Sequence, residues 1–204
     1  MLHLLFLGKA RKNYAMLEIQ IRDARLDDCP ALGHVLVSAM RDAFRGRVPD
    51  HCLEWLTPEV SATNWARNFE PGGSLERGSC LLVAETAAAE VVGLALLGDM
   101  RVETLSDPQL ATRFPRELLT IHVDPQWQRM GVGRQLVASV TQVLRQEGTR
   151  RLLVRVLFEN PNRAFYERLG AVRLGTAPYD WEGYLTEEIL YGWDDVDRLF
   201  GRVQ

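Results

Sequence analysis

The chain has little cysteine and no excess of positive charge. Its three cysteines, Cys29, Cys52 and Cys80, lie far apart with no CxxC pair, and an odd number cannot close a disulfide framework. We therefore expect a reducing, cytoplasmic setting. The 24 Lys and Arg residues are outnumbered by 27 Asp and Glu residues, which leaves a formal charge of −3. Because non-specific binding to a phosphate backbone relies on a positive field, we expect no nucleic-acid partner.

Long hydrophobic runs are also missing. No apolar run approaches the roughly 18 residues that a membrane-spanning helix needs, so we expect no membrane partner. Residues 2–7 are nearly all apolar, but the run is short for an export signal and no basic segment precedes it. Two interpretations of residues 1–16 stay open, an extra strand or translation from a start upstream of Met16. We treat residues 1–16 as an N-terminal extension and 17–204 as one domain, long enough to bury a substantial core.

Hydrophobic periodicity predicts the elements of the first half. After Asp27 and Asp28, which are acidic N-cap candidates, apolar residues recur every three or four positions as far as Ala43. Pro58 interrupts a second helical region. The expected elements are a strand at 17–24, a helix through 32–43, helical segments within 50–69, a loop at 71–78, and an antiparallel hairpin of strands 79–85 and 91–98.

The second half follows a different pattern, strand then helix then strand, which predicts a βαβ unit with parallel strands and a right-handed crossover. The expected elements are a polar connection at 99–116, a strand at 117–123, a helix at 131–148, a strand at 150–158, a short helix at 161–169, and strands at 171–175 and 187–193 separated by a loop at 180–186. The fold class is therefore a single-domain α/β mixed sheet, antiparallel in its N-terminal half, with a parallel βαβ crossover in its C-terminal half and flanking helices.

The segment QRMGVGR, residues 128–134, joins a strand to the first turn of the long helix. Unpaired N–H groups and the positive end of the helix dipole attract anions there, and glycines let a phosphate approach the backbone. A Walker A loop needs GK[ST], whereas Arg134 follows Gly133. A dinucleotide fingerprint would need glycine at Leu136 and a first glycine closer to the strand.

What remains is a QxxGxG pattern, formed by Gln128, Gly131 and Gly133. With this pattern the chain resembles the GNAT superfamily of acetyl-CoA-dependent N-acetyltransferases. The downstream segment NPNRAFYERLGA, residues 160–171, and the early segment IRDARLDD, residues 21–28, are also similar to that family. The resemblance covers residues 17–195, and its specific motifs are confined to 117–170.

The resemblance implies a seat for acetyl-CoA where two neighbouring parallel strands splay apart, with pantetheine along the main chain of strand 117–123 and the pyrophosphate on the loop amides. It implies no metal site. The donor-binding residues are then Ile121, His122 and Val123 in the strand, Gln128, Arg129, Met130, Gly131, Val132, Gly133 and Arg134 in the loop, and Asn160 downstream.

The resemblance also assigns roles in catalysis. Tyr166 occupies the position of a tyrosine that protonates the departing thiolate, although a packing role for its ring stays open. An ammonium with a pKa of about 10 must lose a proton before it attacks, so a base is needed. Glu117 is the first candidate and His122 the second, either of them directly or through water, and water itself is the third candidate. Strict alternation places them on opposite faces, and a bulge would reset this.

We expect an N-acetyltransferase that moves an acetyl group from acetyl-CoA to a primary amine by direct attack. The alternative is a non-catalytic acyl-CoA-binding or sensor protein of the same fold. The acceptor is a small-molecule or peptide amine, and the sequence does not say which. Acids and aromatics interleave in YDWEGY, residues 179–184, which would suit a cationic amine, or would form a solvated loop. The resemblance also allows a homodimer.

Overall fold

The computed structural model describes residues 18–102, 105, 107 and 109–203, so the predictions for residues 1–16 lie outside the described part. Seven strands form one sheet in the order β1-β2-β3-β4-β5-β7-β6. All neighbouring strands pair antiparallel except β4 and β5, which are parallel. The mixed α/β sheet with a parallel crossover in its second half confirms the predicted fold class. The strands are β1 (Ile19–Asp23), β2 (Cys80–Thr86), β3 (Val91–Asp99), β4 (Arg116–Val123), β5 (Leu152–Leu157), β6 (Val172–Trp181) and β7 (Tyr184–Trp193).

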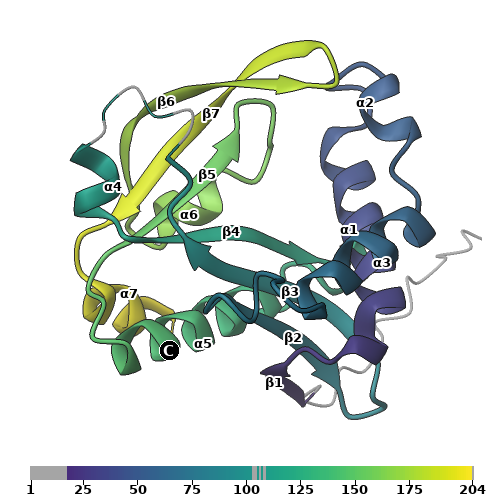
Figure 1. Cartoon of the computed structure of the whole chain (residues 1–204), viewed down its shortest axis with the longest axis horizontal. Coiled ribbons are helices and arrows are strands. Elements are labelled where there is room, and N and C mark those ends of the chain that lie inside the picture. The colour runs from purple at the N-terminus through teal and green to yellow at the C-terminus, as the bar shows by residue number, and fades with distance from the viewer. Residues whose placement is uncertain (1–17, 103–104, 106, 108, 204) are drawn as a thin grey trace, which may run out of the picture.

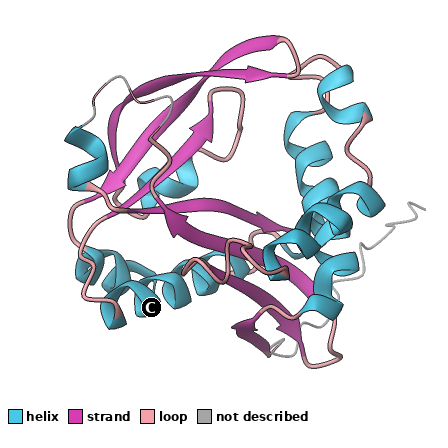
Figure 2. Ribbon diagram, viewed as in Figure 1, coloured by secondary structure: helices cyan, strands magenta, loops and turns pink. Residues whose placement is uncertain are grey.

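Helices cover both faces of the sheet (Figures 1 and 2). The longer helices are α1 (Cys29–Phe44), α3 (Pro58–Ala66), α5 (Val132–Gln146) and α7 (Val196–Val203), and the shorter ones are α2 (His51–Glu54), α4 (Gln109–Arg113) and α6 (Ala164–Arg168). Short 3-10 turns occur at Leu26–Asp28, Arg67–Phe69 and Pro125–Trp127. Helices α4 and α7 were not predicted from the sequence.

The two largest core clusters lie on opposite faces of the sheet. The stripe of Leu136, Val140 and Leu144 on α5 is fully buried, and it packs with α7 against one face of the sheet. Leu32 and Val35 of α1 pack against the opposite face of β2 and β3. The four-residue spacing in α5 therefore produced the apolar face that the sequence predicted. None of the described helices has both the length and the apolar character needed to cross a membrane.

The C-terminal hairpin corrects one prediction. Residues 180–186 were expected to form a loop, but β6 continues to Trp181 and β7 begins at Tyr184. Only Glu182 and Gly183 separate the strands, and both have positive φ, 52° and 85°. Two central residues with positive φ make a hairpin turn whose twist matches the strands, so the chain reverses here without a longer loop. The hairpin thus reaches across to α2 (Figure 1).

Strand β4 positions the site because its two edges pair differently. It pairs with β3 over its whole length, but with β5 only at Arg116, Glu117 and Leu118. Beyond Leu118 the two parallel strands separate. The register with β3 also shifts at this point, since Leu118 pairs with Leu97 and Thr120 with Leu96. Residue 119 is therefore a bulge, at the position where the strands begin to diverge.

Candidate functional site

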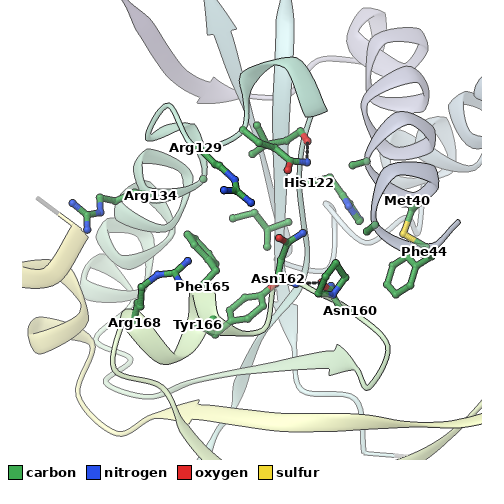
Figure 3. A pocket seen from close by; sticks show the side chains of 18 of the residues that line it. Met40, Phe44, His122, Arg129, Arg134, Asn160, Asn162, Phe165, Tyr166 and Arg168 are labelled. Atoms are coloured by element: carbon green, nitrogen blue, oxygen red, sulfur yellow. Dashed lines mark hydrogen bonds between the residues drawn. The ribbon is translucent and has the colours of Figure 1, made fainter. Parts of the chain in front are cut away.

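A cavity of about 500 Å³ opens where β4 and β5 separate. Its walls come from the end of β4, the loop before α5, the loop and helix α6 after β5, and the C-terminal half of α1. Figure 3 shows His122 on the α1 side, Phe165 and Tyr166 on the α6 side, and Arg129 directed into the space between them. Segments far apart in the sequence therefore enclose one space.

The loop before α5 presents unpaired backbone donors to this cavity. The chain turns through positive φ at Arg129 (62°) and Gly131 (89°) before α5 begins at Val132. The first backbone bond into the helix runs from the Gln135 N–H to the Gly131 carbonyl, and no side chain caps the helix. In the described structure, the amides from Gly131 to Arg134 thus have no acceptor. Unpaired amides at the start of a helix are a geometry that suits an anion.

The outer edge of β4 has no partner strand beyond Leu118. The N–H of Asp124 donates to the Val92 carbonyl at 2.9 Å, so Asp124 points toward β3. Because backbone groups alternate along a strand, those of Ile121 and Val123 point away from β3, toward the opening. The Gln128 side chain donates to the Val123 carbonyl at 3.1 Å and fixes the loop against the strand.

The lining carries positive charge and no acid. Three arginines reach it, Arg129 and Arg134 from the loop and the start of α5, and Arg168 from α6. Their side chains make no ion pair with any described residue, whereas Arg22 and Arg116 elsewhere each bridge two carboxylates. A cavity with this charge suits a polyanionic ligand.

Tyr166 lies on α6 with its ring packed between aromatic neighbours. Tyr166 is 7% exposed. Its ring stacks on the ring of Tyr191, with the centroids 6.2 Å apart, and meets the ring of Phe165 edge to face, with the centroids 5.3 Å apart. Burial raises the pKa of the phenol, so the hydroxyl stays protonated at neutral pH and is suited to donate a proton. No hydrogen bond occupies it in the described structure. The ring of Tyr166 therefore packs in the core while its hydroxyl has no hydrogen-bond partner among the described residues.

The loop before α6 is ordered by its asparagines. The Asn162 N–H donates to the Asn160 side-chain oxygen at 2.8 Å, and the Asn160 N–H donates to the Leu157 carbonyl at 3.0 Å. Asn160 is thereby held at the cavity wall, with its side-chain amide group free to donate.

The two candidate bases have different surroundings. Ile121 and Val123 pack with Leu118 in the core cluster beneath α5, so the bulge at 119 places Glu117 and His122 together on the opposite face. Only His122 lines the cavity. Desolvation lowers its pKa to about 4, so its imidazole is neutral at physiological pH.

Glu117 does not line the cavity. It is fully buried, and Arg101 engages both of its carboxylate oxygens, through the guanidinium and through the backbone N–H. The Nε of Arg155 lies 3.5 Å from Oε1. Glu188 approaches the same arginines at 3.6–3.7 Å, and its burial raises its carboxyl pKa. Glu117 is thus part of a buried charge cluster.

The far end of the cavity is apolar. Met40 and Phe44 of α1 line it beside His122. Behind this wall, Trp181 from the β6–β7 hairpin meets Phe44 edge to face at 5.3 Å and is 6% exposed. The segment 179–184 is thus the end of a hairpin that packs through Trp181 and exposes Asp180, Glu182 and Gly183, and none of its residues lines the cavity.

Hydrogen bonds hold the turn of the hairpin and join its second strand to the chain after β5. Asp180 accepts a hydrogen bond from the Gly183 N–H within the turn. Tyr184 donates to Glu159 at 2.9 Å, and Thr186 donates to the same oxygen at 2.6 Å. These bonds fix the hairpin to the end of β5.

Comparison with known proteins decides the family. The model of the Acetyltransferase (GNAT) family matches residues 32–171, more than half of the chain. The chain belongs to the GNAT family of acetyltransferases. A curated relative, the uncharacterized N-acetyltransferase YuaI of Bacillus subtilis strain 168, is 25% identical over 181 residues, which are 89% of this chain and 96% of the relative.

Solved GNAT structures share the fold. The PaiA N-acetyltransferase of Thermoplasma acidophilum, in complex with coenzyme A, has a TM-score of 0.63 at 17% identity, over 86% of this chain and 98% of the other. A ribosomal-protein-alanine N-acetyltransferase from Brucella melitensis has a TM-score of 0.62 at 22% identity, over 85% and 98%. This GNAT chain therefore spans nearly the full length of both proteins.

Most residues predicted to bind the donor of this GNAT protein come together. Those that line the cavity are Ile121, His122, Val123, Gln128, Arg129, Gly131, Gly133, Arg134 and Asn160. Met130 and Val132 do not, and the Val132 side chain is buried in the core.

Sequence analysis missed several of the larger lining side chains, which are Met40, Phe44, Asn162, Phe165 and Arg168. Three of them, Asn162, Phe165 and Arg168, belong to the segment 160–171 that carried the family resemblance. Their positions close to Tyr166 on the same short helix or the loop before it were a signal that could have identified them. Met40 and Phe44 carried no signal, since each continues the ordinary apolar pattern of an amphipathic helix.

Proposed function

We propose that this GNAT protein transfers an acetyl group from acetyl-CoA to a primary amine by direct attack on the thioester. One observation carries the proposal. The unpaired amides at the start of α5, the edge of β4 that β5 leaves unpaired and the side chain of Tyr166 lie around one cavity with no acidic lining. That combination offers donors to a phosphate at one end and a proton to a leaving group at the other.

Acetyl-CoA, as the donor substrate, fits the residues present. The amides from Gly131 to Arg134, together with the Arg129 guanidinium, would hold the pyrophosphate. The main-chain groups of Ile121 and Val123 would pair with the amides of pantetheine. Asn160, whose side-chain oxygen is engaged by Asn162, keeps its amide group free to donate to the same arm.

Tyr166 would act on the leaving group. Attack of a neutral amine forms a carbon–nitrogen bond and a tetrahedral intermediate, whose collapse breaks the carbon–sulfur bond and leaves a thiolate. The protonated phenol of Tyr166 can hydrogen-bond to that sulfur and transfer its proton, since phenol and thiol have reference pKa values of about 10 and 8.5. The attacking nitrogen loses its extra proton to a base.

The surroundings of the candidate bases favour His122 over Glu117. A general base must reach the proton that it removes, directly or through one water. His122 lines the cavity with a neutral imidazole, whereas both carboxylate oxygens of Glu117 are engaged by Arg101. His122, acting through water where needed, is the base in this proposal, and Glu117 becomes a structural residue.

The apolar end of the cavity bears on the acceptor. Met40 and Phe44 form the wall beside His122, and no carboxylate lines the cavity to hold a second cation. An amine attached to an apolar or aromatic group, free or in a peptide, fits this wall better than a polyamine does.

Two measurements test the proposal. Calorimetry with acetyl-CoA should show binding in the micromolar range, and a thiol-release assay with a panel of amines and peptides should show continuous CoA production. Binding without turnover would support the alternative, a non-catalytic acyl-CoA-binding protein. Absence of binding and of thermal stabilisation by acetyl-CoA would overturn both.

A further inference from the structure

Arg168 is a cavity-lining cation with no described partner. It projects from α6, is exposed, and forms no ion pair or hydrogen bond with any residue in the described ranges. The acid next to it in sequence, Glu167, accepts a hydrogen bond from Tyr191 at 2.7 Å. A guanidinium left without a carboxylate in an acid-free cavity is available to an anionic ligand.

The face of α6 that meets the cavity places Arg168 near the start of α5. Ala164, Phe165 and Arg168 all line the cavity, which is the spacing of one helix face. Phe165 packs at Gly133, where a Cβ would lie 3.5 Å from the ring. Figure 3 shows Arg168 beside Phe165. The guanidinium therefore belongs to the same end of the cavity as the unpaired amides.

The other two arginines have different positions. Arg129 is directed into the cavity from the loop itself, where it adds to the loop amides (Figure 3). Arg134 also lines the cavity, but its side chain leads away from the centre in the same view. Arg168 is thus the cation that comes from a separate element and approaches from the opposite wall.

We propose that Arg168 binds the 3′-phosphate of the donor and makes this enzyme selective for donors that carry that group. The inference rests on the proposed use of acetyl-CoA. That molecule has two anionic centres, a pyrophosphate and a separate phosphate monoester. The loop amides and Arg129 account for the pyrophosphate, while a planar guanidinium suits the dianionic monoester.

The test compares two donors on two variants. Acetyl-CoA and acetyl-3′-dephospho-CoA are titrated into the wild type, Arg168→Met and Arg173→Met, with dissociation constants from calorimetry. Arg173 is an exposed cation on β6 that does not line the cavity, so its loss controls for net charge. We expect the wild type to bind acetyl-CoA roughly tenfold more tightly than the dephospho donor, as for one charge-assisted contact at a partly exposed site.

Arg168→Met should bring that ratio close to one by weakening acetyl-CoA alone, and Arg173→Met should leave it unchanged. An equal loss for both donors, or no preference in the wild type, would overturn the inference while the proposed function stands. Failure of both donors to bind the wild type would overturn the proposed function as well. Should Arg168→Met not fold, Arg168→Gln and the salt dependence of the wild-type ratio decide the same question.

Discussion

Glu117 and Arg101 form a partly buried ion pair next to the point where β4 and β5 separate. The carboxylate has no solvent exposure, and its Oε1 lies 2.5 Å from Nη2 of Arg101 and 3.0 Å from Nε. The backbone N–H of Arg101 donates to Oε2 at 3.0 Å. The pair ties the chain after β3 to the start of β4.

Replacement of this carboxylate should lower stability more than chemistry. In Glu117→Gln the buried guanidinium of Arg155 loses one of its two carboxylate neighbours, Glu188 being the other. Removing one partner of a buried pair costs about 3 kcal/mol or more. We expect that loss in urea unfolding, with kcat within a few-fold of the wild type at a temperature where the variant is folded.

Asp194→Asn is the matched control, because its pair with Arg113 is about half exposed on both sides. Such a pair contributes less than about 1 kcal/mol. A Glu117→Gln variant of normal stability that has lost turnover would instead make Glu117 the base.

Removal of the Tyr166 hydroxyl should affect turnover and spare donor binding. Tyr166→Phe keeps the stacked ring but has no proton to give, so kcat should fall about a hundredfold while the KM for acetyl-CoA changes little. Steady-state thiol release measures both constants. Tyr191→Phe removes the hydroxyl of the stacked neighbour, which is bonded to Glu167, and should leave kcat nearly unchanged. Equal effects of the two variants would remove the role assigned to Tyr166.

His122 should make the fold sensitive to acid. Its pKa is about 4 in the folded protein and about 6.5 when unfolded, so the unfolded chain binds more protons between these values. The stability contributed by the neutral imidazole is complete above pH 6.5 and is lost as pH falls toward 4, by up to about 3 kcal/mol.

His122→Gln should therefore lose less stability than the wild type between pH 6.5 and 4, as thermal unfolding would show. His51→Gln, which removes an exposed imidazole from α2, is the matched control. A parallel decline of the wild type and His122→Gln would contradict the desolvated, neutral state of the imidazole. Because the proposed mechanism makes His122 the base, His122→Gln should also lose turnover at neutral pH.

The two motif glycines should differ in their tolerance of alanine. Gly131 has φ of 89° and open space where a Cβ would lie, so Gly131→Ala should cost about 1–2 kcal/mol through backbone strain alone. Gly133 lies inside α5, and an added Cβ there makes an ordinary contact with Phe165 at 3.5 Å. Gly133→Ala should be neutral or stabilising by up to about 1 kcal/mol. Urea unfolding without ligand would show this, and equal destabilisation would refute it.

Much of the fold followed from local patterns. Three features could be predicted from residues close together in the sequence. They are the four-residue apolar spacing of α5, the two apolar runs that form β2 and β3, and the strand-helix-strand order near Gly131. The hairpin turn at Glu182 and Gly183 was missed because a positive φ at a non-glycine residue has no strong sequence signal. Helix α7 was missed although Val196, Leu199 and Val203 have helical spacing.

The part of the candidate site that comes from one continuous segment could be predicted from the sequence. The part formed by segments distant in the sequence could not. Gln128 and Gly131 lie in one short loop, and the QxxGxG pattern of that loop was enough to predict its turn before α5. The surroundings of Glu117 depend on Arg101 and Arg155, which are brought to it only by the folded sheet. The bulge at residue 119 decides which side chains of β4 share a face, and a shift in strand register cannot be read from one strand alone.

The short pairing between β4 and β5 has a consequence for the sheet as a whole. Three residue pairs join the half that contains β1 to β4 to the half that contains β5 to β7. An extended donor that bonds to Ile121 and Val123 would act as an additional strand segment between the halves. The ligand would then be a structural part of the sheet, and amide hydrogen exchange at those two residues should slow on donor binding and recover when the donor leaves.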